Sequence, residues 1–117
     1  MPTPTIQNYF GTNAEITTNV NGDPILVVKL SDFSAEGLVV PGDPSTLKGS
    51  QLAASLAIKW LTLSVGLDDD PLVGVLVNSP RTSLTERGEV KQKSTEMSLQ
   101  IFTPDNTPAV PDPDLVV

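Results

Sequence analysis

The sequence predicts a small α+β domain in which an antiparallel sheet packs on one helix. Strand-like runs flank an Asn21-Gly22 turn signal, a Leu- and Ala-rich segment over 46–65 has helical character, and residues 71–103 contain further strand-like runs. Leu, Ile, Val and Phe account for 35 of the 117 residues, which is enough apolar content for a folded core.

The length fits one domain, which we place at residues 1–103. An extended, Pro- and Thr-rich lead over 1–11 begins it, and Tyr9 and Phe10 would anchor this lead to its own domain or to a neighbour. Residues 104–117 contain four prolines, three aspartates and no basic residue, so they are predicted to form a flexible or extended tail.

The first part of the predicted sheet covers residues 12–40. Polar and β-branched residues over 13–20 and the apolar run 25–30 enclose Asn-Gly, the strongest short hairpin signal. Residues 33–40 are expected to add a short third strand before a Pro-Gly-Asp-Pro turn.

The helix is predicted over 46–65, with a serine cap at its start and Gly66 as its stop. Polar residues recur at helical spacing and predict a narrow solvent-facing stripe. Alternation of apolar and small residues over 61–67 favours strands instead, and an all-β sandwich is the alternative if 52–66 are strands. The predicted stripe consists of Gln51, Ser55, Lys59 and Thr62.

The second part of the sheet covers residues 71–103. The apolar run 72–77 has the length and composition of a buried central strand. The polar segment 78–93 is expected to be a long hairpin loop or a protruding arm, and the alternating segment 95–103 a half-exposed strand near an edge.

Two residue types are absent, and their absence excludes much chemistry. Without His or Cys the chain has no Ser-His-Asp or Cys-His catalysis, no disulfide, and no imidazole or thiolate zinc site. Neither common Gly-rich phosphate-binding loop occurs. We therefore predict no enzymatic activity and no cofactor.

The balance of charge restricts the partners. Fourteen acidic and seven basic residues give a net charge of −7, which repels phosphate backbones and argues against a nucleic-acid partner. No apolar run approaches the roughly 18 residues that a spanning helix needs, so no membrane partner is expected. A cytoplasmic location is the accompanying expectation.

Two charged clusters are candidate sites. Asp68 and Asp70 in an Asp-Asp-Asp-Pro turn offer carboxylates of the kind that Ca²⁺ or Mg²⁺ binds, although such a sequence is also typical of a solvated turn. Residues 81–93 hold four of the seven basic residues and only two acidic ones, so this stretch has a charge of +2 and the rest of the chain −9. It is expected to contact an acidic partner or an anion, or to be a solvated hairpin. Its four basic residues are Arg81, Arg87, Lys91 and Lys93.

The apolar character of the helix predicts self-assembly. A helix that is apolar over most of its circumference needs more cover than one small sheet supplies, so we expect a homo-oligomer, either a dimer or a trimer. The function favoured is a non-enzymatic structural or protein-interaction module. The alternative is a small-ligand or metal-ion-binding protein with its site at a subunit interface, and a carboxylate-dependent enzyme ranks third. The helix residues expected at the interface are Leu52, Leu56, Trp60 and Leu63.

Overall fold

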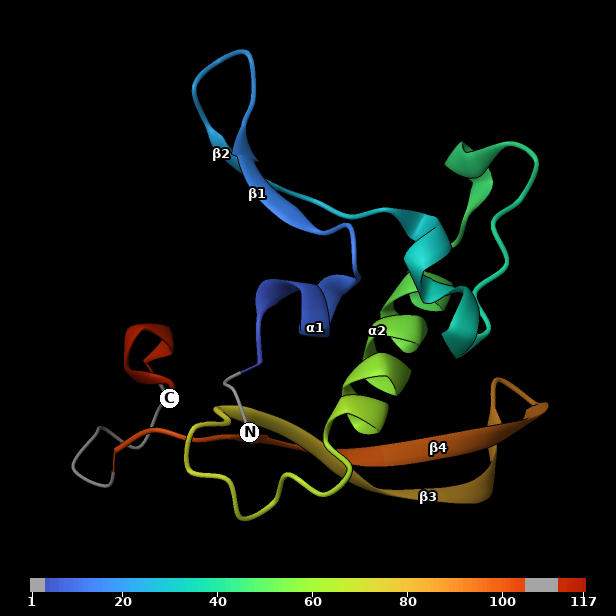
Figure 1. The fold of residues 1–117 in the computed structure, drawn as a ribbon. Helices are drawn as coiled ribbons and strands as arrows, with labels where there is room; N and C mark the ends of the chain where they lie inside the picture. Colours follow the sequence, from blue (N-terminus) through green and yellow to red (C-terminus); the bar gives the residue numbers. More distant parts are fainter. Residues whose placement is uncertain (1–3, 105–111) are drawn as a thin grey trace. The chain divides into compact units, whose positions relative to one another are not determined.

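The computed structural model describes residues 4–104 and 112–117, and it confirms the predicted α+β class. About 31% of the chain is helical and 31% is strand. The chain divides into two compact units, Met1–Leu63 and Ser64–Val117. Each unit contains one antiparallel hairpin (Figure 1).

The prediction of one sheet was wrong. Strands β1 (Glu15–Thr18) and β2 (Pro24–Val27) form one two-stranded sheet, and β3 (Val75–Arg87) and β4 (Val90–Ile101) form another. Within residues 4–104 and 112–117, each strand pairs only with its hairpin partner. The alternation of apolar and polar residues therefore identified the hairpins correctly. It contains no information on whether two hairpins pair with each other to form one sheet.

The hairpin predicted at Asn21-Gly22 is confirmed. The Asn19 side-chain oxygen accepts hydrogen bonds from the backbone N–H groups of Asn21 and Asp23, at 2.9 and 3.0 Å. Such an Asx-type turn replaces backbone contacts with side-chain contacts and sets the register of the short strands. Glu15 consequently lies opposite Val27.

The third strand expected over 33–40 is replaced by a 3₁₀ helix, η1 (Leu30–Glu36). Phe33 on this helix is fully buried, with 0% of its surface exposed. A strand would turn alternate residues to opposite faces, whereas the 3₁₀ turn directs Phe33 into the small core. A second 3₁₀ turn, η2 (Pro44–Thr46), follows and is capped by the Asp43 carboxylate.

The lead was predicted to be extended, but its residues Ile6–Phe10 form helix α1. A capping box starts this helix. The Thr5 N–H donates to the Asn8 side-chain oxygen at 2.8 Å, and the Asn8 N–H donates to the Thr5 hydroxyl at 3.4 Å. The Ser/Thr-x-x-Glu/Gln form of this motif is the usual sequence signal, and asparagine at its last position concealed it.

Helix α2 (Gly49–Leu63) confirms the helix and excludes the all-β alternative for residues 52–63. The predicted polar stripe was wrong at Ser55, which is only 2% exposed. Its hydroxyl donates to the Leu52 carbonyl at 2.7 Å, so the helix itself satisfies this buried group. A serine that bonds back to its own helix can lie inside a core, which explains why polarity alone misplaced it.

Aromatic packing joins α1 to α2 within unit Met1–Leu63. The Trp60 ring meets the rings of Tyr9 and Phe10 edge to face, with centroids 6.1 and 6.0 Å apart. The Trp60 indole N–H also donates to the Tyr9 carbonyl at 2.8 Å. Of the two predicted uses of Tyr9 and Phe10, the structure shows anchoring to their own unit.

Asp32 joins η1 to the segment after α1. Its carboxylate accepts from the backbone N–H and the side-chain amide of Asn13, both at 2.8 Å. Gly11 lies so close that a Cβ there would be 2.8 Å from the Asp32 Cβ, and its φ of +114° also disfavours a side chain. The Asn13 backbone N–H is the main cause that lowers the pKa of Asp32, partly opposed by desolvation.

This contact predicts a pH dependence. Because folding lowers the pKa of Asp32, its contribution is fully present above the unfolded value of 3.8 and is lost progressively as pH falls from there through the lower folded value. We expect Asp32→Asn to destabilise unit Met1–Leu63 at about pH 7, with a difference from wild type that shrinks toward about pH 3. Urea midpoints followed by Trp60 fluorescence measure this, with Glu15→Gln as the charge-matched control. A difference that stays constant over this range would contradict the assignment.

In unit Ser64–Val117 the core lies at the base of the β3–β4 hairpin. Ser64 is 1% exposed, and its hydroxyl accepts from the backbone N–H of Val77 at 2.9 Å. Serine thus supplies an acceptor to a buried donor that would otherwise be costly. The buried apolar residues of this core are Leu67, Val73, Leu76 and Val77.

The segment 78–93, expected to be a loop or an arm, is strand for most of its length. The register shifts between Asn78 and Arg81, where Ser79 has a φ of +57°. Pairing then continues to a two-residue turn at Gly88 and Glu89, both with positive φ, which matches the type I′ geometry of tight hairpins. The sequence signal was missed because Gly precedes the acidic residue instead of following it.

The last described residues return to the base of this hairpin. The Val117 N–H donates to the Phe102 carbonyl at 3.0 Å, and the Phe102 N–H donates to the Gly74 carbonyl at 2.8 Å. A Cβ at Gly74 would lie 1.8 Å from the Val117 carbonyl oxygen, so the close approach requires glycine. A short 3₁₀ turn, η3, covers Pro113–Leu115. Residues 105–111 of the predicted tail lie outside the described residues.

Candidate functional site

The outer part of the β3–β4 hairpin, residues 81–93, contains the predicted basic cluster and is here called the arm. Every residue of the arm is exposed. The strands are long, at 13 and 12 residues, and only the first residues of β3 reach the core. The fold therefore presents a two-stranded ribbon (Figure 1). Its side chains are exposed on both faces.

The strand register sorts the arm residues onto two faces. Leu84 lies opposite Lys93, and Glu86 lies opposite Lys91. Directly paired residues share a face, as do residues two apart, so these four side chains form one surface, here called the lysine face. Arg81 and the other odd-numbered residues of β3 lie on the reverse face.

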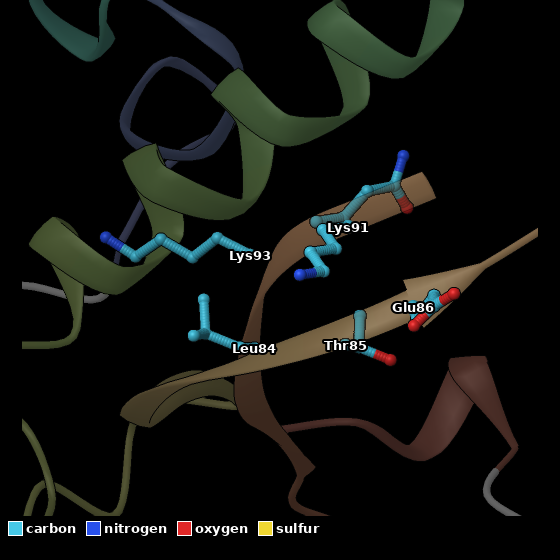
Figure 2. Close-up of a pocket in the computed structure, with 6 residues that line it drawn as sticks. Leu84, Thr85, Glu86, Lys91 and Lys93 are labelled. Atoms are coloured by element: carbon cyan, nitrogen blue, oxygen red, sulfur yellow. The ribbon is translucent and has the colours of Figure 1, made fainter. Parts of the chain in front are cut away.

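The lysine face combines one apolar side chain with two lysines and the Glu86 carboxylate. Leu84 is 89% exposed, an unusual degree for a large aliphatic residue in the middle of a strand. Lys91 and Lys93 form no ion pair with any residue that the structure describes. A hollow of about 540 Å³ runs along this part of the hairpin, and Figure 2 shows the side chains that line it. These are Leu84, Thr85, Glu86, Lys91, Gln92 and Lys93.

The two arginines of the arm have partners within the hairpin. Arg81 contacts the Glu96 carboxylate at 2.9 Å through its terminal nitrogen, and Arg87 donates to the Gln92 side-chain oxygen at 2.6 Å. Both side chains of the Arg81–Glu96 pair are exposed, so the pair contributes about 0–1 kcal/mol. The arginines lie six residues apart on one strand, about 20 Å, which is too far to hold one small anion.

The aspartates predicted as metal ligands are used in local contacts. Asp68 accepts from the side-chain amide of Asn78 at 3.0 Å, and Asp70 accepts from the backbone N–H of Leu72 at 3.0 Å. In the parts of the chain that the structure describes, no group of three His, Cys, Asp or Glu side chains gathers as metal ligands would. The metal site at Asp68 and Asp70 stays a prediction from the sequence.

The helix residues predicted at an interface are all half-buried. Part of their surface is covered inside their own unit, because Trp60 packs against α1 and donates its indole N–H there. Contacts between η1 and α2 supply further cover. The sequence could not show this cover because both η1 and α1 were predicted to be extended. An interface at Leu52, Leu56, Trp60 and Leu63 stays a prediction.

One charged pair was not predicted as a site. Lys59 on α2 lies 3.3 Å from a Glu36 carboxylate oxygen, and its ammonium lies 5.5 Å from the centre of the Phe33 ring. The side chains of Lys59 and Glu36 are only 19% and 9% exposed. They are 23 residues apart, and no local pattern connects them.

No family model, curated protein or solved structure matches the chain. Among residues 4–104 and 112–117, none of the helices has the length and apolarity required to cross a membrane.

Proposed function

We propose that the protein is a non-enzymatic interaction module that assembles with copies of itself through the arm. The observation that carries this proposal is the exposed ribbon of the arm, on whose lysine face Leu84 lies opposite Lys93. Neither lysine of this face forms an ion pair with a residue that the structure describes. The size of the oligomer, a dimer or a trimer, and a cytoplasmic location belong to the same proposal.

The energetics of a lone hairpin support an assembled state. A two-stranded ribbon is marginally stable in water by itself and usually needs a third strand or a packed face. Burying Leu84 from its present exposure would contribute about 1.5–3 kcal/mol. Contact with another protein surface would therefore bury Leu84 and also supply the packed face that stabilises a two-stranded ribbon.

The charge distribution supports a second copy as the partner. The arm has a charge of +2, and the remainder of each chain has −9. An arm from one copy and the acidic remainder of another attract each other, which speeds association and orients the two chains. Exposed acidic residues such as Asp68 and Asp69 offer part of that negative surface.

Light scattering after size exclusion tests the proposal. We expect a mass above the 12.4 kDa of one chain at about 50 mM NaCl, and a lower mass at about 500 mM because salt screens exposed charges. The Lys91→Ser/Lys93→Ser variant should dissociate at low salt, and Leu84→Ser should dissociate at both salt concentrations. Lys29→Ser/Lys48→Ser removes the same charge from exposed positions outside the arm and should assemble as wild type does.

Two results would overturn the proposal. A wild-type mass of one chain at both salt concentrations excludes self-assembly under these conditions. A wild-type oligomer that all arm variants retain excludes the arm as its interface and directs attention to Leu52, Leu56 and Leu63 on α2 instead.

A further inference from the structure

The β3–β4 ribbon has two edges, and they differ in how well they can accept a further strand. The edge of β3 is interrupted by Pro80, which has no N–H, and by the register shift between Asn78 and Arg81. The extra residue at this shift belongs to β3, so β4 runs regularly over Val90–Ile101, without Pro or Gly. Strand addition is therefore expected at the edge of β4.

Every second residue of β4 directs its backbone groups away from β3. The Phe102 N–H donates to the Gly74 carbonyl at 2.8 Å, which places the groups directed toward β3 at even-numbered positions. The tight turn closed by Arg87 and Val90 requires the same alternation. Over 91–99 the odd-numbered residues, here called the outer residues, direct their N–H and C=O groups to the open edge, where the described chain supplies no backbone partner. They are Lys91, Lys93, Thr95, Met97 and Leu99.

The charges of unit Ser64–Val117 favour a second copy as the source of the added strand. The arm has a charge of +2, whereas the remainder of this unit contains acidic residues and no basic residue. Part of that acidic surface lies at the base of the hairpin, because Asp68 accepts from the side chain of Asn78 at 3.0 Å. Pairing of β4 with β4 of a second copy about a two-fold axis is antiparallel, so the arm of each copy lies along the base of the other hairpin.

The charges on β4 also select the register. Directly opposed residues of antiparallel strands point to the same face, so the two-fold axis must place one residue of β4 opposite itself. The longest overlaps of Val90–Ile101 with its copy have the axis at Thr95 or at Glu96. An axis at Glu96 would oppose two carboxylates, whereas an axis at Thr95 opposes no like charges and pairs residues 90–100 of both copies. Lysines on this edge thus restrict pairing to one register.

We propose that β4 pairs with β4 of a second copy about a two-fold axis at Thr95, which joins the two hairpins into one four-stranded antiparallel sheet. Lys91 then lies opposite Leu99 of the second copy. Lys93 likewise lies opposite Met97. The aliphatic part of each lysine covers the apolar side chain opposite it, and its ammonium stays in solvent. This inference rests on the self-assembly proposed for the arm and adds the number of copies, two, and the edge that joins them.

Amide hydrogen exchange of the full-length protein, resolved by residue, distinguishes this pairing from contacts made by side chains alone. In the assembled protein at low salt, the outer residues should exchange as slowly as the even-numbered residues of β4, which bond to β3. Dilution to single chains should speed exchange at the outer residues by on the order of tenfold or more, because their N–H groups lose their acceptors. The even-numbered residues should change less.

Cysteine substitution tests the register, because the chain contains no Cys. In the proposed pairing the two Thr95 Cα atoms lie about 5.5 Å apart, a distance that a disulfide spans. Thr95→Cys should therefore become a disulfide-linked dimer in most of the protein under mild oxidation. Leu99→Cys is the matched control on the same edge, at a residue that is 57% exposed. Its two sulfurs would lie about 27 Å apart, so it should remain largely unlinked.

The results that would overturn this inference differ from those that would overturn self-assembly through the arm. An assembled protein whose outer residues exchange as fast as unpaired amides would exclude the edge pairing and leave the arm as an interface. A mass of three chains would do the same, because two-fold pairing closes at two copies. Equal cross-linking of Thr95→Cys and Leu99→Cys would exclude the axis at Thr95. A wild-type mass of one chain at low salt would overturn both proposals.

Discussion

Replacing Phe33 with alanine is expected to lower the unfolding free energy of unit Met1–Leu63 by about 3–5 kcal/mol. Phe33 is the only large apolar side chain of that unit, among the residues described, that is completely buried. Its ring also faces the Lys59 ammonium at 5.5 Å. Alanine would leave a cavity between η1 and α2 that such short elements have little means of closing.

Urea unfolding followed by tryptophan fluorescence measures this effect, because Trp60 is the single tryptophan and lies in the same unit. Val39→Ala is the matched control, since Val39 is 80% exposed and its truncation should change the midpoint very little. A loss below about 1 kcal/mol for Phe33→Ala would contradict the packing of η1 on α2.

Local patterns were sufficient for the elements that depend mainly on near neighbours. The Asn21-Gly22 hairpin forms as predicted, because Asn19 and the turn residues supply their own contacts. The helix predicted over 46–65 is present as Gly49–Leu63. The α+β class follows from these elements together, and it is also confirmed.

Two of the wrong predictions concern burial, which contacts distant in the sequence determine. Residues 33–40 have strand composition, yet the burial of Phe33 is satisfied by a 3₁₀ turn. Ser55 has the polarity of a surface residue, yet its helix satisfies its hydroxyl inside the core. In both cases tertiary packing overrides what the local sequence favours, which is a strand over residues 33–40 and an exposed side chain at Ser55.

The candidate site was likewise predicted from the sequence only in part. Composition identified the arm as the basic part of an acidic chain. Only the register, with its shift between Asn78 and Arg81 and its turn at residues 88–89, separates the lysines from the arginines. The Glu36–Lys59 pair could not be predicted from the sequence, because it depends on how η1 packs against α2.

In unit Ser64–Val117 the corresponding prediction is Leu76→Ala, which should lower the unfolding free energy by about 2–5 kcal/mol. Leu76 is 2% exposed and lies on β3 opposite Gln100, at the buried base of the hairpin. Hydrogen exchange of the β3 and β4 amides measures the loss. Ser83→Ala, at an exposed position on the reverse face of the same strand, is the control and should leave the exchange at the base unchanged.

The same variant tests whether residues 1–103 form one domain, as the sequence predicts. If they unfold cooperatively, Leu76→Ala must also lower the urea midpoint reported by Trp60, although Trp60 belongs to the other unit. A Trp60 transition that Leu76→Ala leaves in place, together with faster exchange in β3 and β4, would show two separately unfolding units. In that case Phe33→Ala should leave the β3 and β4 exchange unchanged.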